Sequence, residues 1–435
     1  MVKGYWVPVL HSHLPFVKHP EYDNFLEEHW LFEAITECYI PLFQRLKQLE
    51  EEQIPFKLTT SVTPPLAEML DDAHLMQKYQ VYLDRQIELG EKEVQRTADS
   101  DEYRDIARFY HNLFVETKAF FNGFLAGNVL NGYRHFYNAG SLEVITCGAT
   151  HGFLPLLNVN KKAVEVQIEV AVQAHKKHFN RAPRGIWLPE CAYYDGLDEI
   201  LKANEIDFFI VDSHALVYGR PTAMYGVYAP AYTPHSVAAF GRDAESSKQV
   251  WSSKEGYPGD LNYRDFYRDI GYDLDYDYIQ PYINPDGVRV FTGYKYHKIT
   301  GETDHKEVYV PHVAKSRTAD HARNFHYNRE KQLEHLGSLM DRTPMIVSPY
   351  DAELFGHWWF EGPDFLYHLF KEIHQHGVIK AITPLDYLTM YPQNQMVNPN
   401  PSSWGDKGYY DVWLNRENAW IYRHLHQMAD VICEK

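Results

Sequence analysis

Two carboxylate side chains of this sequence directly follow apolar segments. Glu190 comes after the apolar stretch 185–189 and is close to Trp187 and a pair of tyrosines. Burying a carboxylate among aromatic rings costs free energy unless the group is hydrogen-bonded or has a function. We therefore expect Glu190 to be a catalytic group, and a structural role as a helix cap or ion-pair partner is the alternative.

The second carboxylate is Asp351, which follows the apolar segment 345–348 and precedes a cluster of aromatic and histidine residues that includes His357. Glu353 competes with it for a catalytic role, and either carboxylate could instead be an ion-pair partner. Retaining glycoside hydrolysis requires two carboxyl groups about 5 Å apart, one to attack the anomeric carbon and one to protonate the leaving oxygen. Two carboxylates at strand ends on one face of a barrel can meet this requirement.

His11 and His13 follow the first apolar segment of the chain. Residues two apart in an extended segment lie on the same face, so their imidazoles point the same way. The pair is interpreted as satisfied polar groups, as a metal pair, or as hydrogen-bonding groups for sugar hydroxyls. The metal hypothesis adds Asp212 and His214, as in barrel-type polysaccharide deacetylases, because imidazole and carboxylate ligands suit zinc. Nothing else in the chain demands a metal, and we expect none.

The elements that must position these residues alternate between strands and helices. Short apolar segments typical of buried strands recur, and segments with helical periodicity separate many of them. This alternation predicts a parallel α/β sheet, and α/β barrels carry their active sites at the carboxyl ends of the strands. The predicted strands are 5–10, 56–62, 142–146, 184–188, 207–211, 288–292 and 345–348, and the predicted helices are 161–179, 197–204 (with Asp195 as a possible cap), 313–340, 363–376 and 418–434.

Two long segments interrupt the alternation. Residues 65–140 are charged and helix-rich, which predicts a helical insertion beside the barrel. Residues 219–285 are rich in Tyr, Gly, Pro and Asp and too irregular for a helix, and irregular segments of that length are usually functional. We expect a catalytic barrel over residues 1–390 that includes both segments, followed by a C-terminal helical region over 391–435.

Composition restricts the partners of the protein. The formal net charge of -17 argues against binding to the phosphates of nucleic acid and favours a neutral substrate. The four cysteines have neither zinc nor disulfide spacing. No segment has the length and hydropathy of a signal or membrane helix, so we expect a cytoplasmic protein without a membrane partner. Aromatic residues make up 15% of the chain, which fits an aromatic core or a carbohydrate site. The sequence leaves the oligomeric state open.

Five longer motifs are the most distinctive part of the sequence. They cover residues 11–15, 142–155, 187–193, 350–363 and 403–413. Together they resemble the signature regions of glycoside hydrolase family 57, and within that family they are most similar to those of the 1,4-α-glucan branching enzymes. The resemblance spans nearly the whole chain.

This resemblance implies an incomplete (β/α)7 barrel with a helical insertion and a short C-terminal helical region that closes over the cleft. It implies that Glu190 is the nucleophile, which forms a glycosyl-enzyme, and that Asp351 is the general acid/base. No metal or organic cofactor is implied, and the substrate would be an α-glucan such as amylose, glycogen or a starch-like polymer. The residues expected to contact substrate are His11, His13, Trp30, His151, Trp187, His357, Trp404 and Trp413, although the tryptophans could instead pack in the core.

The chain departs from the family pattern in two places. It ends at Lys435, before the further helices of longer branching enzymes, so we expect an abbreviated C-terminal region. Residues 232–243 correspond to a mobile tyrosine-bearing loop but are few, and Tyr232 need not be the equivalent tyrosine. The expected function is a branching enzyme of glycogen biosynthesis, which cleaves α-1,4 links and forms α-1,6 links by double displacement. The alternatives are an α-amylase-like hydrolase or 4-α-glucanotransferase with the same catalytic pair, and a glucan-binding barrel without activity.

Overall fold

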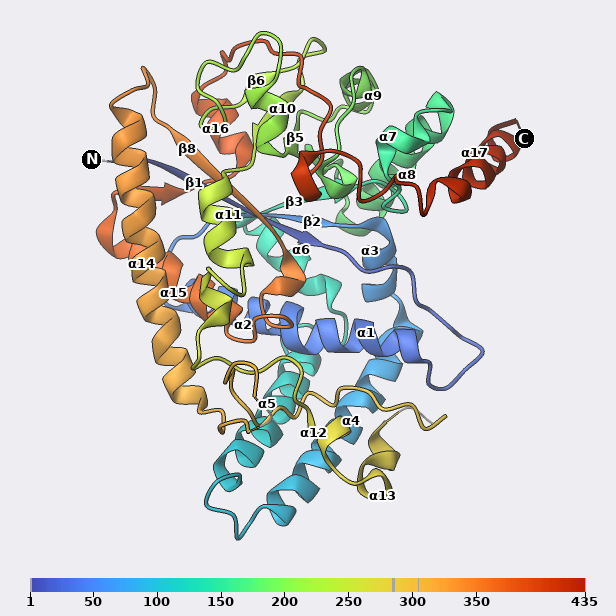
Figure 1. Ribbon diagram of the computed structural model, residues 1–435, viewed down its shortest axis with the longest axis vertical. Helices are drawn as coiled ribbons and strands as arrows, with labels where there is room; N and C mark the ends of the chain where they lie inside the picture. The colour runs from blue at the N-terminus through green and yellow to red at the C-terminus, as the bar shows by residue number, and fades with distance from the viewer. Residues whose placement is uncertain (1, 284–285, 304, 435) are drawn as a thin grey trace.

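The centre of the fold is a curled, mostly parallel sheet surrounded by helices (Figure 1). The computed structural model describes residues 2–283, 286–303 and 305–434. Seven parallel strands follow the order β8-β1-β2-β3-β4-β5-β7, and within the described residues no ladder joins β7 to β8. This is an incomplete (β/α)7 barrel, as the resemblance implied. The seven strands are β1 (Gly4–Ser12), β2 (Leu58–Val62), β3 (Leu142–Cys147), β4 (Gly185–Trp187), β5 (Phe208–Val211), β7 (Ala238–Gly241) and β8 (Met345–Asp351).

The strands form because their residues are apolar on both faces, which is typical of parallel sheets covered by helices. On β1, Val7 and Val9 pack in one cluster with residues of β3, β4, β5, β7 and β8, which fills the barrel interior. Trp6 and Leu10, on the opposite face of β1, pack with residues of the surrounding helices. Two short strands extend the sheet: β6 (Ala231–Tyr232) pairs antiparallel with β7, and β9 (Ile379–Ala381) pairs with β1.

Six of the seven predicted strands are confirmed, but the strand predicted at 288–292 is wrong. Its last residue, Thr292, instead donates its backbone N–H and its hydroxyl to Asp269, so this part of the segment is held by a side chain and not by a ladder. The seventh barrel strand is β7, which lies inside the segment 219–285. Its sequence Ala-Ala-Phe-Gly contains no β-branched residue, so the pattern gave no strand signal.

The predicted helices agree closely with α8 (Lys161–Phe179), α9 (Leu197–Ala203), α14 (Pro311–Gly337), α15 (Gly362–His376) and α17 (Ala419–Glu434). The predicted cap at Asp195 is wrong, because α9 begins after Gly196 without a side-chain cap. The expectation that 219–285 is too irregular for a helix is also wrong. This segment contains α11 (Ala244–Trp251), which Asp243 caps by accepting the Ser246 N–H, and the one-turn helices α12 (Ile270–Asp273) and α13 (Tyr276–Ile279).

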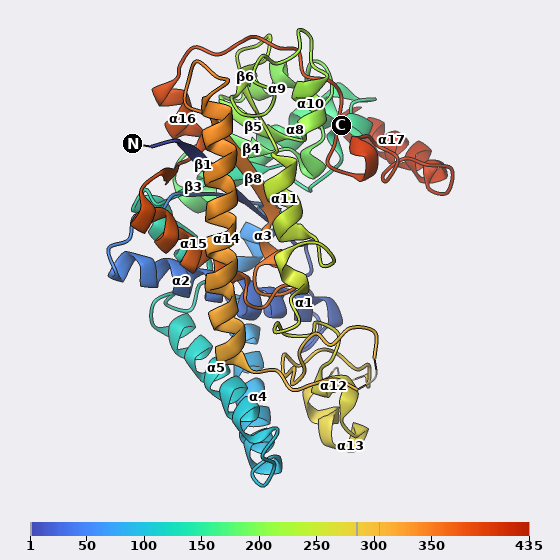
Figure 2. The ribbon, with the colours of Figure 1, turned by 60° about the vertical axis from the view of Figure 1, so that its left-hand side comes forward.

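The helix-rich stretch after β2 folds into α3 (Pro64–Leu70), α4 (Ala73–Arg96), α5 (Arg104–Asn122) and α6 (Leu130–Asn138). Helices α4 and α5 run side by side and project away from the sheet (Figure 2). Between β1 and β2 the chain forms α1 (Leu26–Ala34), a π-helical turn (Ile35–Tyr39) and α2 (Ile40–Glu51), all in one continuous rod. The remaining short helices are α7 (Leu154–Leu157), α10 (Ser213–Val217) and α16 (Pro384–Met390).

The last helix, α17, lies at the margin of the molecule and buries none of its residues (Figure 1). In the part of the chain that the structure describes, no helix combines the length and apolar character needed to cross a membrane.

Candidate active site

The carboxyl ends of β1, β3, β4 and β8 border a cavity of about 620 Å³, a volume typical of small-molecule sites. Nine of the ten site residues predicted from the sequence line this cavity, and the tenth, Trp187, is fully buried beneath it against His11. The nine are His11, His13, Trp30, His151, Glu190, Asp351, His357, Trp404 and Trp413. Residues separated by up to 400 positions in the sequence therefore meet at one end of the barrel.

Glu190 occupies a tight turn (Pro189–Cys191) directly after β4. Its backbone has φ 61° and ψ 23°, a left-handed conformation that is uncommon for residues other than glycine and that tends to occur at functional sites. The C-terminal segment holds this turn, because Trp404 donates its backbone N–H to the Glu190 carbonyl at 3.0 Å and its indole N–H to Glu190 Oε2 at 2.9 Å. Burial raises the pKa of Glu190, and the indole hydrogen bond opposes that rise by favouring the ionised form.

Asp351 is the last residue of β8 and pairs in register with His11 on β1. Burial raises the pKa of this carboxyl well above its usual value, and the nearby charges of Glu353 and Glu190 raise it further. The two carboxylates predicted to form a catalytic pair thus share one cavity, and the charge of Glu190 helps to raise the pKa of Asp351. The environment favours the protonated form of Asp351 more strongly than that of Glu190.

The competing carboxylate Glu353 is held by the protein itself. Its Oε1 accepts the backbone N–H of His13 at 3.1 Å and the hydroxyl of Tyr39 at 2.5 Å. Burial raises its pKa to about 7. Within the described residues no group donates a hydrogen bond to the Asp351 carboxylate, which leaves that carboxylate free for a ligand. The geometry therefore favours Asp351 over Glu353 as the group that reacts.

Three histidines form a stack beside Glu190. The ring centroids of His13 and His151 are 3.9 Å apart, and those of His11 and Trp187 are 4.6 Å apart. Ser61 and Thr63, at the end of β2, fix the rings through their hydroxyls, at 2.6 Å from His11 Nδ1 and 3.1 Å from His13 Nδ1.

Burial keeps these three imidazoles neutral. It lowers the pKa of His13 to about 3 and that of His151 to about 4, and it holds that of His11 well below its usual value. A neutral imidazole has one donor and one acceptor nitrogen, a combination that suits sugar hydroxyls. His151 lies close to the candidate nucleophile, with Nδ1 4.0 Å from Glu190 Oε1.

The metal site hypothesised from His11, His13, Asp212 and His214 is not assembled. Asp212 is hydrogen-bonded to His214 at 2.6 Å and ion-paired with Arg242 at 3.1 Å, and neither Asp212 nor His214 borders the cavity. The physical reason is that Asp212 caps α10, which turns both residues away from the histidine stack.

Another set of possible ligand atoms lies close together at the stack. These atoms belong to His11, His151 and Cys147 and lie within 4.8 Å of one another. Burial raises the pKa of the Cys147 thiol well above its usual value, whereas metals bind the thiolate. Protonation of the thiol therefore opposes metal binding at this set.

Four residues that the sequence analysis did not single out also line the cavity: Glu33, Arg242, Trp251 and Trp358. Glu33 lies three positions after Trp30 on α1 and so shares its face, a spacing that could have identified it. Trp358 directly follows His357. Arg242 directly follows β7, and Trp251 is the last residue of α11. The sequence analysis predicted neither of these elements.

Tyr232, the tyrosine of the stretch 232–243, lies away from the cavity. It belongs to β6 and borders a different hollow with Arg184 and Asp207, which precede β4 and β5. It therefore lies at the amino ends of the strands, opposite the candidate catalytic carboxylates.

Comparison with known proteins identifies relatives over nearly the whole chain. Residues 8–399 match the model of glycosyl hydrolase family 57. The chain is 32% identical over 99% of its length to a 1,4-α-glucan branching enzyme of Thermococcus kodakarensis, and it spans 64% of that protein's length.

Two solved structures are also similar. One is described as a novel α-amylase from Thermotoga maritima, with a TM-score of 0.91 and 46% identity over 98% of this chain and 80% of that chain. The other is a branching enzyme from Pyrococcus horikoshii, with a TM-score of 0.86 and 33% identity over 98% of this chain and 77% of that chain.

Proposed function

The chain belongs to glycosyl hydrolase family 57, and we propose that it is a 1,4-α-glucan branching enzyme that works by a retaining double displacement. The observation that carries the proposal is that Glu190 and Asp351, on different strands, line one cavity together with histidines and tryptophans. Asp351 is held strongly toward the protonated form, whereas Glu190 accepts an indole hydrogen bond that favours its ionised form. A retaining glycosidase needs this division of roles.

In the first step, Asp351 donates its proton to the oxygen of the α-1,4 link while Glu190 attacks the anomeric carbon. The bond between that carbon and oxygen breaks, a glucan fragment with a free end leaves, and the remaining fragment is attached to Glu190 as an ester. The indole N–H of Trp404 donates a hydrogen bond to Glu190 Oε2 at 2.9 Å, so Oε1 is the oxygen left free to attack.

In the second step, the now ionised Asp351 accepts a proton from the attacking hydroxyl. The 6-hydroxyl of a second glucan chain attacks the anomeric carbon, and the bond from that carbon to the Glu190 oxygen breaks, which restores the Glu190 carboxylate and gives an α-1,6 link with net retention. If water attacks instead, the same intermediate yields a shortened glucan with a new reducing end.

The neutral histidine stack and the tryptophans supply the sugar contacts. His11, His13 and His151 offer donors and acceptors to the hydroxyls of the sugar attached at Glu190. Trp404 and Trp413 border the same space, and Trp413 is stacked on Phe153 with ring centroids 4.5 Å apart, which fixes its plane. Flat aromatic faces pack well against the C–H faces of glucose.

Branching requires a second chain as acceptor, and the rim of the cavity offers surfaces for one. Trp30 is 46% exposed and Trp358 is 54% exposed, and both border the cavity. Exposed tryptophans at a cavity edge favour binding of an extended neutral polymer. The relatives described as branching enzymes support the same assignment.

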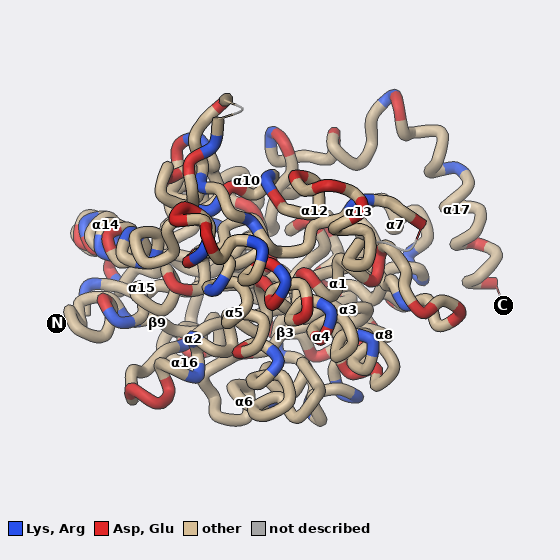
Figure 3. The backbone as a smooth tube through the Cα atoms, turned by 90° about the horizontal axis from the view of Figure 1, so that it is seen from below, with Lys and Arg blue, Asp and Glu red and all other residues tan. Residues whose placement is uncertain are grey.

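A neutral substrate also suits the charge of the molecule. The formal net charge is -17, and acidic and basic positions are interspersed along the chain (Figure 3). A polyanion would be repelled overall, whereas an uncharged glucan would not.

Hydrolysis of α-1,4-glucan is the second candidate function. Two observations favour it: the similar Thermotoga maritima structure is described as an α-amylase, and Tyr232 lies at the opposite end of the barrel from the catalytic carboxylates. No tyrosine of that stretch therefore covers the cavity against water.

The test is incubation of amylose with the purified protein, with reducing ends counted before and after an α-1,6-specific debranching enzyme is added. A branching enzyme gives few ends before debranching and many after it. A hydrolase gives ends from the start, and debranching adds none. The Glu190→Gln variant is the control, and it should leave amylose unchanged in both assays.

A further inference from the structure

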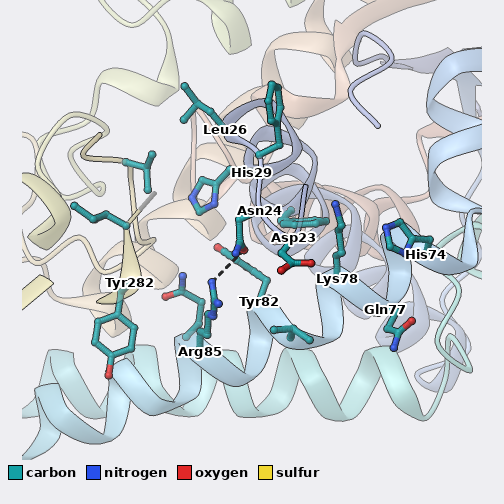
Figure 4. A pocket seen from close by; sticks show the side chains of 16 residues that line it. Asp23, Asn24, Leu26, His29, His74, Gln77, Lys78, Tyr82, Arg85 and Tyr282 are labelled. Atoms are coloured by element: carbon teal, nitrogen blue, oxygen red, sulfur yellow. Dashed lines mark hydrogen bonds between the residues drawn. The ribbon is translucent and has the colours of Figure 1, made fainter. Parts of the chain in front are cut away.

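A second cavity, of about 420 Å³, lies on the other side of α1, between that helix and α4 (Figure 4). Leu26, His29 and Phe32 of α1 face this second cavity, whereas Trp30 and Glu33 of the same helix face the catalytic cavity. We propose that the second cavity is a binding site for a segment of the α-glucan chain, separate from the catalytic subsites. The inference rests on the proposed function for the identity of the polymer.

The walls of the second cavity are aromatic. Phe25 and Phe32 come from the start and the body of α1, Tyr82 from α4, and Tyr282 from the segment after α13. Tyr82 and Tyr282 line the cavity although they are only 9% and 6% exposed. Aromatic walls with a few polar groups between them are typical of carbohydrate sites, because sugars have apolar C–H faces and a rim of hydroxyls.

One buried polar group in the wall has an unused hydrogen-bonding atom. Gln86 of α4 is 2% exposed, and within the described residues its Oε1 has no hydrogen-bond partner. Leaving a buried acceptor unpaired costs stability, so its presence calls for an explanation such as a ligand. The oxygen is almost fully buried, so a hydroxyl donor of a ligand reaches it only when the Gln86 amide turns toward the cavity.

The charges around the cavity favour a neutral ligand over a phosphate. Lys78 is neutralised by Glu28, with Nζ 2.8 Å from Oε2, and it also donates to the carbonyls of His19 and Tyr22. Arg85 donates to Asn24 Oδ1 at 3.1 Å, the contact drawn as a dashed line in Figure 4. Asp23 also lines the cavity, so the acidic groups Asp23 and Glu28 balance the positive charges of Lys78 and Arg85.

The position of the site suggests what it does. Because α1 forms a wall of both cavities, a polymer held in the second cavity stays close to the catalytic cavity. Tethering raises the effective concentration of the remaining chain at the active site without any new contact there. A polymer long enough to reach both cavities gains from this, whereas a short oligosaccharide does not.

The experiment counts binding sites calorimetrically, with maltoheptaose as the probe and Glu190→Gln as the background, so that ligand binds without turnover. We expect two sites per chain in this background. Adding Gln86→Met, which keeps the volume but removes the acceptor, should leave one site. Adding Gln95→Met, on an exposed position of α4 outside the cavity, should leave both.

A kinetic measurement in the active enzyme gives the second readout. Gln86→Met should raise KM for amylose by about three- to tenfold, the loss expected for one hydrogen bond, with kcat unchanged. KM for maltoheptaose at the catalytic cavity should not change. Gln77→Ala should also raise KM for amylose. Gln77 lines the same cavity at an exposed position, so this substitution should not disturb the fold.

Three results would be decisive. A single site in the Glu190→Gln background overturns the inference, and so do two sites that survive Gln86→Met. Normal KM for amylose in both Gln86→Met and Gln77→Ala also overturns it. A wild-type chain that leaves amylose unchanged instead overturns the proposed function, so the two failures are distinguishable.

Discussion

Glu190 has a left-handed backbone conformation at the end of a barrel strand, and a residue more than 200 positions away holds its carboxylate. The turn presents the side chain to the cavity, and Trp404 binds both its carbonyl and its Oε2. Asp351, by contrast, has the regular backbone geometry of a strand. Its unusual property is a strongly raised pKa, which its surroundings cause. At the residue scale, the two candidate catalytic groups are therefore prepared in different ways.

The first prediction concerns the indole hydrogen bond. Trp404→Phe keeps an aromatic ring but removes the N–H that lowers the pKa of Glu190, so this pKa should rise. A nucleophile must be ionised, so the acid limb of the pH–rate profile should move to higher pH. At the wild-type optimum, kcat/KM should fall about 10- to 100-fold, as for a hydrogen bond to a charged group. Trp413→Phe is the matched control, and an acid limb at the same pH in both variants would contradict the assignment.

The second prediction concerns Asp351→Asn. Loss of acid/base assistance should lower kcat about 10²- to 10⁴-fold on glucan. Burial holds the pKa of Asp351 well above its unfolded value, so the folded protein keeps a proton at a pH where the unfolded chain has released it. Asparagine removes that cost, and the midpoint of thermal unfolding at neutral pH should rise.

This stability gain has a defined pH dependence. It should be largest above the folded pKa of Asp351 and should vanish as the pH falls below about 3.9, where aspartate is protonated in the unfolded chain as well. Thermal unfolding of wild type and variant between pH 3 and pH 8 checks it. A variant that is less stable than wild type at pH 7 would show that Asp351 is a structural ion-pair partner.

Sequence reasoning worked well for residues that end predicted strands or belong to long motifs. His11, Glu190 and Asp351 are of this kind, and all three border the cavity. It missed Arg242 and Trp251, because they follow β7, a strand too short and too poor in β-branched residues to be seen. The choice between Asp351 and Glu353 also needed the structure, because it depends on the hydrogen bond from Tyr39, which no local pattern encodes.

At the scale of elements, the π-helical turn between α1 and α2 connects the catalytic cavity to the helical side of the molecule. Its Glu37 accepts from His357 Nδ1 at 2.7 Å and pairs with Arg264 at 3.0 Å. Burial alone would raise the pKa of Glu37, but Arg264 and His357 outweigh it and lower that pKa to about 2. π-helical turns often occur at functional sites, and here the turn places a charge that orients a cavity histidine.

The third prediction tests that orientation. Glu37→Gln leaves the fully buried guanidinium of Arg264 without its partner, which should cost about 3–5 kcal/mol of folding free energy. His357 loses its fixed orientation, so KM for amylose should rise more than kcat falls. The control is Glu372→Gln, which breaks the half-exposed pair with His376 on α15 and should cost less than about 1 kcal/mol. Equal losses in urea unfolding of the two variants would contradict the argument.

The C-terminal residues divide into two parts with different roles. Trp404, Gly405, Val412 and Trp413 border the cavity, whereas α17 contacts α8 and has no fully buried residue. The amphipathic pattern of α17 was read correctly as a helix, but its apolar residues Trp420, Met428 and Ile432 remain at least 60% exposed. Of the described C-terminal residues, the loop before α17 contributes to the cavity and α17 does not line it.

The fourth prediction follows from that division. Deletion of residues 419–435 should change the midpoint of thermal unfolding by less than about 4 °C, because no residue of α17 is fully buried and the helix contributes little apolar surface to the core. Activity on amylose should persist. A shorter chain that ends at residue 402 should lose activity, because it lacks Trp404 and Trp413. Loss of activity in the first deletion would show that α17 has a catalytic or binding role.

At the scale of the whole molecule, one parallel barrel collects residues from β1, β3, β4 and β8 at a single end, and α1 and α4 border a second cavity beside it. Alternating strands and helices predicted the barrel, because parallel strands buried on both faces leave long apolar segments in the sequence. The arrangement of the chain around Arg264 and Asp269 could not be predicted, because these side chains hold it through an ion pair and hydrogen bonds that no local pattern encodes.

The account depends most on the assignment of Glu190 as the nucleophile, and a covalent intermediate tests it most directly. The Asp351→Asn variant is incubated with a 5-fluoro-α-glucosyl fluoride, whose fluoride leaves without an acid and whose ring fluorine slows the second step. Peptide mass spectrometry then locates the added sugar. The account predicts one label per chain, on the peptide containing Glu190, and none in Glu190→Gln. A label on another residue, or a product of inverted configuration without any label, would contradict it.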